Sequence, residues 1–226
     1  MAEHTVKAFD EEITTLRGLI AEMGGLAELA IGEAVEALTK RSQELAAQVI
    51  ERDKKIDRLE AEVDRLAVKI IALRAPMADD LREVLAALKI AGILERIGDY
   101  AKNIAKRVSR IEGRLNSEPQ TLIPAMAEIA GEMVHDVLTA FAARDPALAV
   151  DVIERDARVD AFYDSIFRNM VSFMMENPST ITSAAHLLFI ARNIERIGDH
   201  ATNIAEQVYY AATAEYVVDR LERPEN

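Results

Sequence analysis

Hydrophobic residues recur at intervals of three and four along almost the whole chain, with polar residues between them. This spacing places the hydrophobic side chains on one face of a helix, and no segment shows the strict alternation that is typical of a β-strand. The pattern predicts an all-α protein of six long helices. The six runs cover residues 9–38, 56–73, 90–108, 122–141, 148–173 and 187–208.

Turn and capping residues separate these runs. Asp145 followed by Pro146 is typical of a helix start, because aspartate caps the free amide groups and proline fits the first helical position. Proline turns at 75–76 and 177–179 mark two other connections, and residues 113–119 form the longest polar break. Such short connections predict that successive helices run antiparallel.

The second half of the chain repeats the first. The segment ERDKKID at 51–57 reappears as ERDARVD at 154–160, and 11 of the 18 positions in 91–108 are identical in 191–208. A period of about 100 residues is far longer than the ~20–50 residues of solenoid repeats. The duplication therefore predicts two tandem, pseudo-equivalent three-helix bundles, with limits at residues 1–114 and 118–226.

Composition and charge limit the classes of function. The 27 Lys and Arg residues against 39 Asp and Glu residues give a net charge of −12, which argues against nucleic acid and against an anionic lipid surface as partners. The absence of cysteine excludes thiolate catalysis and cysteine zinc sites. There is no signal-peptide pattern at the start and no run of about 18 apolar residues, so we expect a cytoplasmic protein without membrane insertion.

The two halves agree best at polar positions, which core packing does not demand. The third helix of each half carries Glu-Arg-Ile-Gly-Asp followed by Ala-x-Asn-Ile-Ala, and the second helix carries two aspartates four residues apart. With about 100° per residue, the Glu, Asp and Asn of the third helix point away from its hydrophobic face. The candidate residues are Asp53, Asp57, Glu95, Asp99 and Asn103 in the first half and Asp156, Asp160, Glu195, Asp199 and Asn203 in the second.

Clustered carboxylates with a carboxamide oxygen suit hard cations such as Mg, Ca, Mn or Fe. The alternative is an ordinary solvated face, and the first half supports it, because Lys102 stands three residues after Asp99 and Lys106 is near. In the second half Thr202 and Glu206 replace these lysines while the carboxylates stay. On chemistry alone, a metal-binding surface and a charged face both remain open, and the second site should be the tighter one.

Other signals are fewer. Gly98 and Gly198 stand inside the third helices, where glycine costs about 1 kcal/mol relative to alanine but lets another group approach the backbone. Glu132 and His135 form a single Glu-x-x-His pair, whereas a di-iron bundle needs two, so we expect them to point off the core without forming a site. The sequence contains no nucleophile elbow, P-loop or dinucleotide-binding turn.

The repeated motifs closely resemble the signature of the PhoU family, bacterial regulators of phosphate uptake. They are the two copies of E-R-I-G-D-x-A-x-N-I-A at 95–105 and 195–205, preceded by E-R-D-x-x-(I/V)-D at 51–57 and 154–160. The resemblance covers essentially the whole chain. It implies two three-helix bundles side by side and a cytoplasmic, non-enzymatic regulator that links the Pst phosphate ABC transporter to the PhoR sensor histidine kinase.

The resemblance further implies repression of the phosphate-starvation response when phosphate is plentiful. Some PhoU-like proteins bind multinuclear iron or zinc clusters through E/D-x-x-x-D motifs. The resemblance would therefore make the eight carboxylates above metal ligands and the two asparagines additional ligands. The expected partners are PhoR and the Pst ATPase, and the transporter would hold the protein at the inner membrane. The resemblance leaves open whether the protein forms a homodimer. The alternatives are a carboxylate-bridged metal enzyme, which the outward-facing ligands argue against, and a metal-free helical scaffold.

Overall fold

The computed structural model describes residues 2–111 and 117–217, and its regular structure over these ranges is entirely helical. The long helices confirm the predicted all-α class. None of the described helices has the length and apolar character needed to cross a membrane. The elements are α1 (Ala2–Lys40), α2 (Gln43–Arg74), α3 (Asp79–Ala105), α4 (Ser117–Ala143), α5 (Pro146–Glu176) and α6 (Ile181–Thr213), with short 3-10 helices η1 (Val108–Arg110) and η2 (Pro178–Thr180).

The helix ends follow the capping residues. The carboxylate Oδ1 of Asp145 accepts hydrogen bonds from the backbone N–H groups of Ala147 and Leu148 at 2.9 and 3.1 Å, and Pro146 occupies the first position of α5. In α2 the hydroxyl of Ser42 accepts from the N–H of Leu45 at 3.2 Å. These caps satisfy amide groups that a helix start leaves without partners. The predicted limit between the two halves, at 114–118, falls mostly on residues outside the described ranges.

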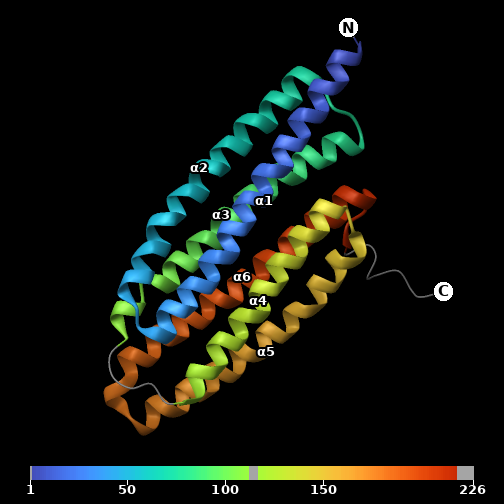
Figure 1. Cartoon of the computed structure of the whole chain (residues 1–226). Helices are drawn as coiled ribbons and strands as arrows, with labels where there is room; N and C mark the ends of the chain where they lie inside the picture. Colours follow the sequence, from blue (N-terminus) through green and yellow to red (C-terminus); the bar gives the residue numbers. More distant parts are fainter. Residues whose placement is uncertain (1, 112–116, 218–226) are drawn as a thin grey trace, which may run out of the picture.

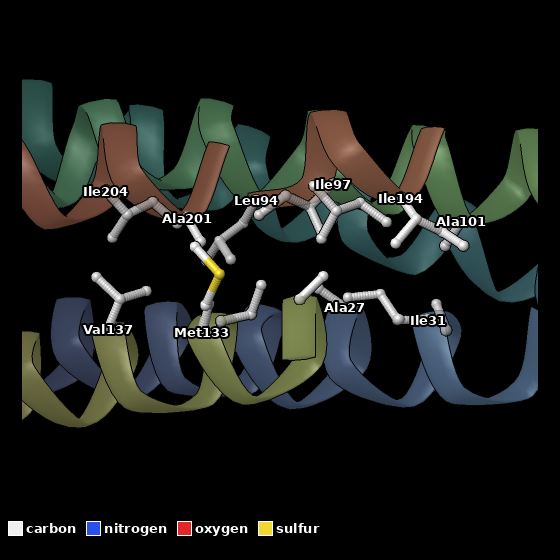
Figure 2. Packing of buried hydrophobic residues seen from close by; sticks show 14 of the residues in the cluster. Ala27, Ile31, Leu94, Ile97, Ala101, Met133, Val137, Ile194, Ala201 and Ile204 are labelled. Atoms are coloured by element: carbon white, nitrogen blue, oxygen red, sulfur yellow. The ribbon is translucent and has the colours of Figure 1, made fainter. Parts of the chain in front are cut away.

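Two three-helix bundles lie side by side, as predicted (Figure 1). In the first bundle α2 packs against α1 and α3, and in the second α5 packs against α4 and α6. The bundles meet mainly where α1 packs against α4 and α3 packs against α6. Figure 2 shows the shared core between them, with side chains of α3 and α6 on one side and side chains of α1 and α4 on the other.

The shared core explains why α3 and α6 bury so much of their surface. Each helix packs against its own bundle and also against the other bundle, so residues on several faces are buried. Each fully buried isoleucine or leucine contributes about 1.5–3 kcal/mol. The fully buried residues of the two helices include Ile90, Leu94, Ile97 and Ile104 of α3 and Ile190, Ile194, Ile197 and Ile204 of α6.

Helices α3 and α6 run antiparallel across the junction. Near their middles, the rings of Tyr100 and His200 stack edge to face with centroids 5.2 Å apart. Towards the end of the first bundle, Arg107 lies against His186 and Phe189. Tyr100 and His200 are equivalent residues of the two repeats, so their contact places an approximate twofold axis between the bundles at this point.

Candidate functional site: the paired carboxylate clusters

Each carboxylate cluster lies where the second and third helices of a bundle meet, and a glycine sets the distance between them. A β-carbon on Gly98 would lie 3.2 Å from Oδ1 of Asp53, and one on Gly198 would lie 3.0 Å from Oδ1 of Asp156. The groups that approach the glycine backbone are a carboxylate of the neighbouring helix and the apolar side chain three residues after it, since Cδ1 of Ile56 would lie 2.8 Å from a β-carbon on Gly98 and Cγ1 of Val159 would lie 3.3 Å from one on Gly198. The two glycines give the aspartates of α2 and α5 room to lie against α3 and α6.

In the first cluster a lysine holds the two helices together. The ammonium group of Lys102 donates a hydrogen bond to Oδ2 of Asp53 at 2.5 Å and another to the carboxylate of Asp99. Asp53 is only 4% exposed, and burial raises its pKa while the hydrogen bond from Lys102 opposes the shift. For Lys102, burial lowers the pKa, but the bonds to Asp53 and Asp99 raise it, and the net shift is upward. The predicted pairing with Asp99 is confirmed and extends across to α2.

The second cluster has no such cation. At the position of the lysine stands Thr202, whose hydroxyl donates to the backbone carbonyl of Asp199 at 2.6 Å. The buried Oδ1 of Asp156 has no hydrogen-bond partner in the described part of the chain. Burial, and then the nearby carboxylates of Asp160 and Asp199, raise the pKa of Asp156 to about 6. The second cluster thus holds a desolvated, uncompensated carboxylate.

The two equivalent glutamates of the third helices differ in exposure. Glu95 is half-buried, and burial followed by the charges of Asp99 and Glu60 raises its pKa. Glu195 is only 8% exposed; it accepts from Arg192, while its Oε2 has no partner among the described residues. The sequence-based expectation that both point away from the core is wrong for Glu195, because α5 covers that flank of α6.

The remaining predicted residues are more exposed than Asp53 and Glu195. Asp57 and Asp160 are exposed on α2 and α5, and Asn103 is half-buried on α3. Asn203 is exposed and lines a groove with Glu95 and other α3 residues of the opposite bundle. Within residues 2–111 and 117–217, no three carboxylate or imidazole groups converge as a complete ligand set for one metal ion. The ligand set therefore stays a prediction.

The chemistry of the second cluster nevertheless fits a hard cation. Its donors are carboxylate oxygens, and one oxygen each of Asp156 and Glu195 is buried without a hydrogen-bond partner among the described residues. A cation beside Asp156 would give its buried oxygen a partner and would offset both the burial and the charges of Asp160 and Asp199 that raise its pKa. In the first cluster the ammonium of Lys102 already performs this neutralisation, so a metal would have to displace it.

A contact between the bundles gives His135 a partner that the sequence did not indicate. Glu132 and His135 are exposed, as expected, but Nδ1 of His135 lies 3.2 Å from Oε2 of Glu28 on α1. Both helices line a groove of about 410 Å³ between the bundles. His200, which follows Asp199 in the sequence, lies against Tyr100, and its Nδ1 is 2.9 Å from the carbonyl oxygen of Arg196.

Comparisons with known proteins agree with this architecture. The sequence model of the PhoU domain matches residues 20–108 and again 123–208. The chain is 55% identical to a phosphate-specific transport system accessory protein PhoU homolog of Zymomonas mobilis, over 96% of this chain and 92% of that protein. It is 46% identical to the homolog of Rhizobium meliloti, over 93% and 89% of the two chains.

Solved structures show the same fold. The crystal structure of PhoU from Pseudomonas aeruginosa superposes with a TM-score of 0.86 at 36% identity, covering 92% of this chain and all of that one. The phosphate transport system regulatory protein PhoU from Streptococcus pneumoniae gives the same TM-score at 27% identity, over 92% of this chain and 99% of that one.

Proposed function

Because this chain belongs to the PhoU family of phosphate-transport accessory and regulatory proteins, which are not enzymes, we propose that it represses the phosphate-starvation response as an adaptor. It binds the ATPase of the Pst transporter and the PhoR sensor histidine kinase when phosphate is plentiful. The observation that carries the proposal is 55% identity to a phosphate-specific transport accessory protein across 96% of the chain. Its place in the cell is the cytoplasmic side of the inner membrane, held there by the transporter.

The carboxylate clusters are the proposed metal-binding surface of this adaptor. In the second bundle Asp156, Asp160, Glu195 and Asp199 hold the cation, and in the first Asp53, Asp57, Glu95 and Asp99 do so. A bound divalent or trivalent ion, from the set Fe, Zn, Mg, Mn and Ca, supplies positive charge between two packed helices. The proposal is supported by the buried oxygens of Asp156 and Glu195, which lack partners in the described part of the chain.

A deletion strain tests the regulatory role. Without the protein, we expect alkaline phosphatase to be expressed constitutively in medium with high phosphate, and a plasmid copy of the wild-type chain should restore repression. Unchanged phosphatase expression in the deletion strain would contradict the proposal. Direct binding of the purified chain to the Pst ATPase and to the cytoplasmic part of the kinase, measured separately, decides which of the two partners it contacts.

A further inference from the structure

The outer side of α5 and α6, next to the turn that joins them, exposes large apolar side chains. Of the eleven large hydrophobic residues that are exposed in the described part of the chain, five lie within residues 167–189. Three follow one another on α5 at intervals of four residues and are 38% to 79% exposed, and two on α6 are 48% and 54% exposed. We call this surface the apolar face. It consists of Phe167, Val171, Met175, Ile181 and Phe189.

Ring contacts place the two phenylalanines on one side of the helix pair. The ring centroids of Tyr163 and Phe167, one turn apart on α5, are separated by 6.4 Å. The guanidinium of Arg192 on α6 lies 5.5 Å from the centroid of the Tyr163 ring. Phe189 precedes Arg192 by three residues and is therefore its neighbour on the surface of α6. The apolar face is thus a single surface that spans both helices.

The first half of the chain carries charged residues where the second half carries its phenylalanines. In the alignment of the two repeats, Asp64 of α2 corresponds to Phe167, and Lys89 of α3 corresponds to Phe189. Because the first bundle forms the same fold with charged residues at these positions, helix packing does not require the aromatic rings of the second.

The whole segment around the turn is poor in charge. Residues 165–191 contain two residues of the types Asp, Glu, Lys and Arg, whereas the equivalent residues 62–91 contain ten. Depletion of charge together with enrichment in Phe and Met is typical of the core of a protein–protein interface. A contiguous apolar surface exposed to water also marks a site of interaction. The apolar face is therefore a docking surface that belongs to the second bundle alone.

The charges along the two sides of the apolar face are positive. On the α3 side, the guanidinium of Arg107 lies 4.3 Å from the centroid of Phe189. Burial and then the charges of Arg107 and Arg110 lower the pKa of His186, one turn before Phe189, so Arg110 lies on this side as well. On the α5 side the exposed Arg168 follows Phe167. A partner thus meets an apolar centre between arginines.

These borders distinguish between three kinds of occupant. A second copy of this chain, bound through the same face, would bring the arginines of one copy against those of the other, because a twofold contact joins the same patch on both sides. A flat anionic lipid surface along α5 would also meet Asp160 and Asp164, which are exposed at the far end of the face. A helix about 10–12 Å wide is narrow enough to avoid both carboxylates.

The length of the face also suits a helix. Tyr163 and Met175 are twelve residues apart on α5, or about 18 Å. Two neighbouring helices form a groove that accepts a third, and α4 packs in this way against both α5 and α6 within the bundle. A partner helix on the apolar face would repeat this packing on the outside.

We propose that the apolar face binds an amphipathic helix of a partner protein, about 12 residues long, with apolar side chains on one side and carboxylates beside them. Its apolar side chains pack on Phe167, Val171 and Phe189, and its carboxylates pair with Arg110 and Arg168. This surface rests on the proposed adaptor role, since an adaptor needs a protein-binding surface, but its test requires neither the transporter nor the kinase. Failure of the peptide test would therefore leave the regulatory role uncontradicted.

The test uses the full-length protein and a fluorescein-labelled peptide of about 12 residues, with Leu at intervals of three and four and Glu beside them. We expect saturable binding by fluorescence anisotropy, and no binding of the same peptide with Ser in place of Leu. Phe167→Ser with Phe189→Ser should weaken binding at least about tenfold. The control, Val68→Ser with Leu85→Ser, removes two exposed apolar side chains of the first bundle and should change binding less than about twofold.

Arg110→Glu with Arg168→Glu should weaken binding of the Glu peptide at least about threefold, whereas a peptide with Gln in place of Glu should bind this variant and the wild type equally. Circular dichroism verifies that each variant keeps its helix content, and Phe167→Ser alone repeats the test with a smaller change. Equal losses in the two double serine variants, or no binding of the Leu peptide, would overturn the proposal. So would a dimer in sedimentation velocity, or binding to phosphatidylglycerol vesicles, that Phe167→Ser with Phe189→Ser abolishes, because the apolar face would then serve a second copy or a lipid surface.

Discussion

Asp156 and Gly198 meet at the contact of α5 with α6, where the carboxylate oxygen Oδ1 of Asp156 occupies the space beside the glycine backbone. A β-carbon at residue 198 would lie 3.0 Å from that oxygen and 3.3 Å from Cγ1 of the buried Val159. Asp53 and Gly98 repeat the relationship in the first bundle. Helix packing thus explains the glycine in each motif. The same packing buries the carboxylate beside the glycine, and removing this charged group from water destabilises the folded protein.

Gly198→Ala should lower the stability of the protein. The added methyl group gains up to about 1 kcal/mol of helix propensity, but overpacking against Asp156 and Val159 costs about 1–3 kcal/mol. We expect a net loss of about 1 kcal/mol in the free energy of unfolding. The control Gly18→Ala, which meets no atom within 4 Å, should gain up to about 1 kcal/mol. Urea denaturation of both variants measures the difference, and equal stabilities would show that α5 can move away from α6.

The raised pKa of Asp156 predicts a pH dependence in metal-free protein. Its value of about 6 in the folded state lies above the ordinary 3.8, so the folded state binds the proton more tightly between these values. The contribution of Asp156 to the free energy of unfolding of the wild type is therefore highest below about pH 4, where Asp156 is protonated, and it falls as the pH rises to about 6, where the folded protein loses this proton. Asp156→Asn should therefore be more stable than the wild type at pH 8, by about 1 kcal/mol after allowance for solvent screening, and equally stable near pH 4.

Urea titrations in EDTA at several pH values between 4 and 8 follow this difference. Asp164→Asn, at an exposed position on the same helix, is the matched control and should track the wild type at each pH. A constant offset between Asp156→Asn and the wild type over the whole range would mean that ionisation of Asp156 is not the cause.

The sequence predicts the six helices well, because periodicity is a local property, but it places their ends well only where a capping residue marks them. The runs predicted at 56–73 and 90–108 begin more than ten residues after the observed starts of α2 (Gln43–Arg74) and α3 (Asp79–Ala105). Asp145 with Pro146 marks the start of α5, and the duplication predicts two bundles. The burial of Asp53 and Glu195 is not predictable in this way, since one helix's periodicity does not say which flank a neighbour covers. The contact of Glu28 with His135 depends on the register of α1 against α4, for which neither helix carries a sequence signal.

Glu83 illustrates the same limit and gives a third prediction. This glutamate of α3 is 6% exposed and pairs with Arg17 of α1 and with Arg144, which precedes α5 in the other bundle. Glu83→Gln should reduce the free energy of unfolding by about 2 kcal/mol, below the ~3–5 kcal/mol of a fully buried pair because both arginines reach solvent. Glu36→Gln, which breaks an exposed pair with Lys40, should cost less than about 0.5 kcal/mol. Similar small losses for both would show that Glu83 does not couple the bundles.

Exchanging Lys102 and Thr202 should exchange the properties of the two clusters. Lys102→Thr leaves the buried Asp53 without its cation, so the metal-free protein should lose about 2–3 kcal/mol of stability while the first cluster gains affinity for Mn²⁺. Thr202→Lys should do the opposite in the second cluster, since its ammonium would neutralise Asp156 and Asp199. Calorimetric titration with Mn²⁺ and urea denaturation in EDTA measure the two effects. If both variants bound Mn²⁺ as the wild type does, the lysine would not control the site.

Glu195→Gln with Asp199→Asn tests the metal surface directly, because the double change keeps the shape of both side chains and removes their charge. Protein purified without chelators should lose most of its bound metal, measured by inductively coupled plasma mass spectrometry, while its helix content stays unchanged. The control, Glu154→Gln with Asp164→Asn, removes two exposed carboxylates from α5 and should retain the metal. Loading of the wild type should fall below about pH 6, because ligand carboxylates must be ionised and the pKa of Asp156 is raised to that value. Equal metal content in the two double variants would show that the second cluster is an ordinary charged face. The burial of Asp156 would then be a consequence of the packing of α5 against α6 and would have no role in metal binding.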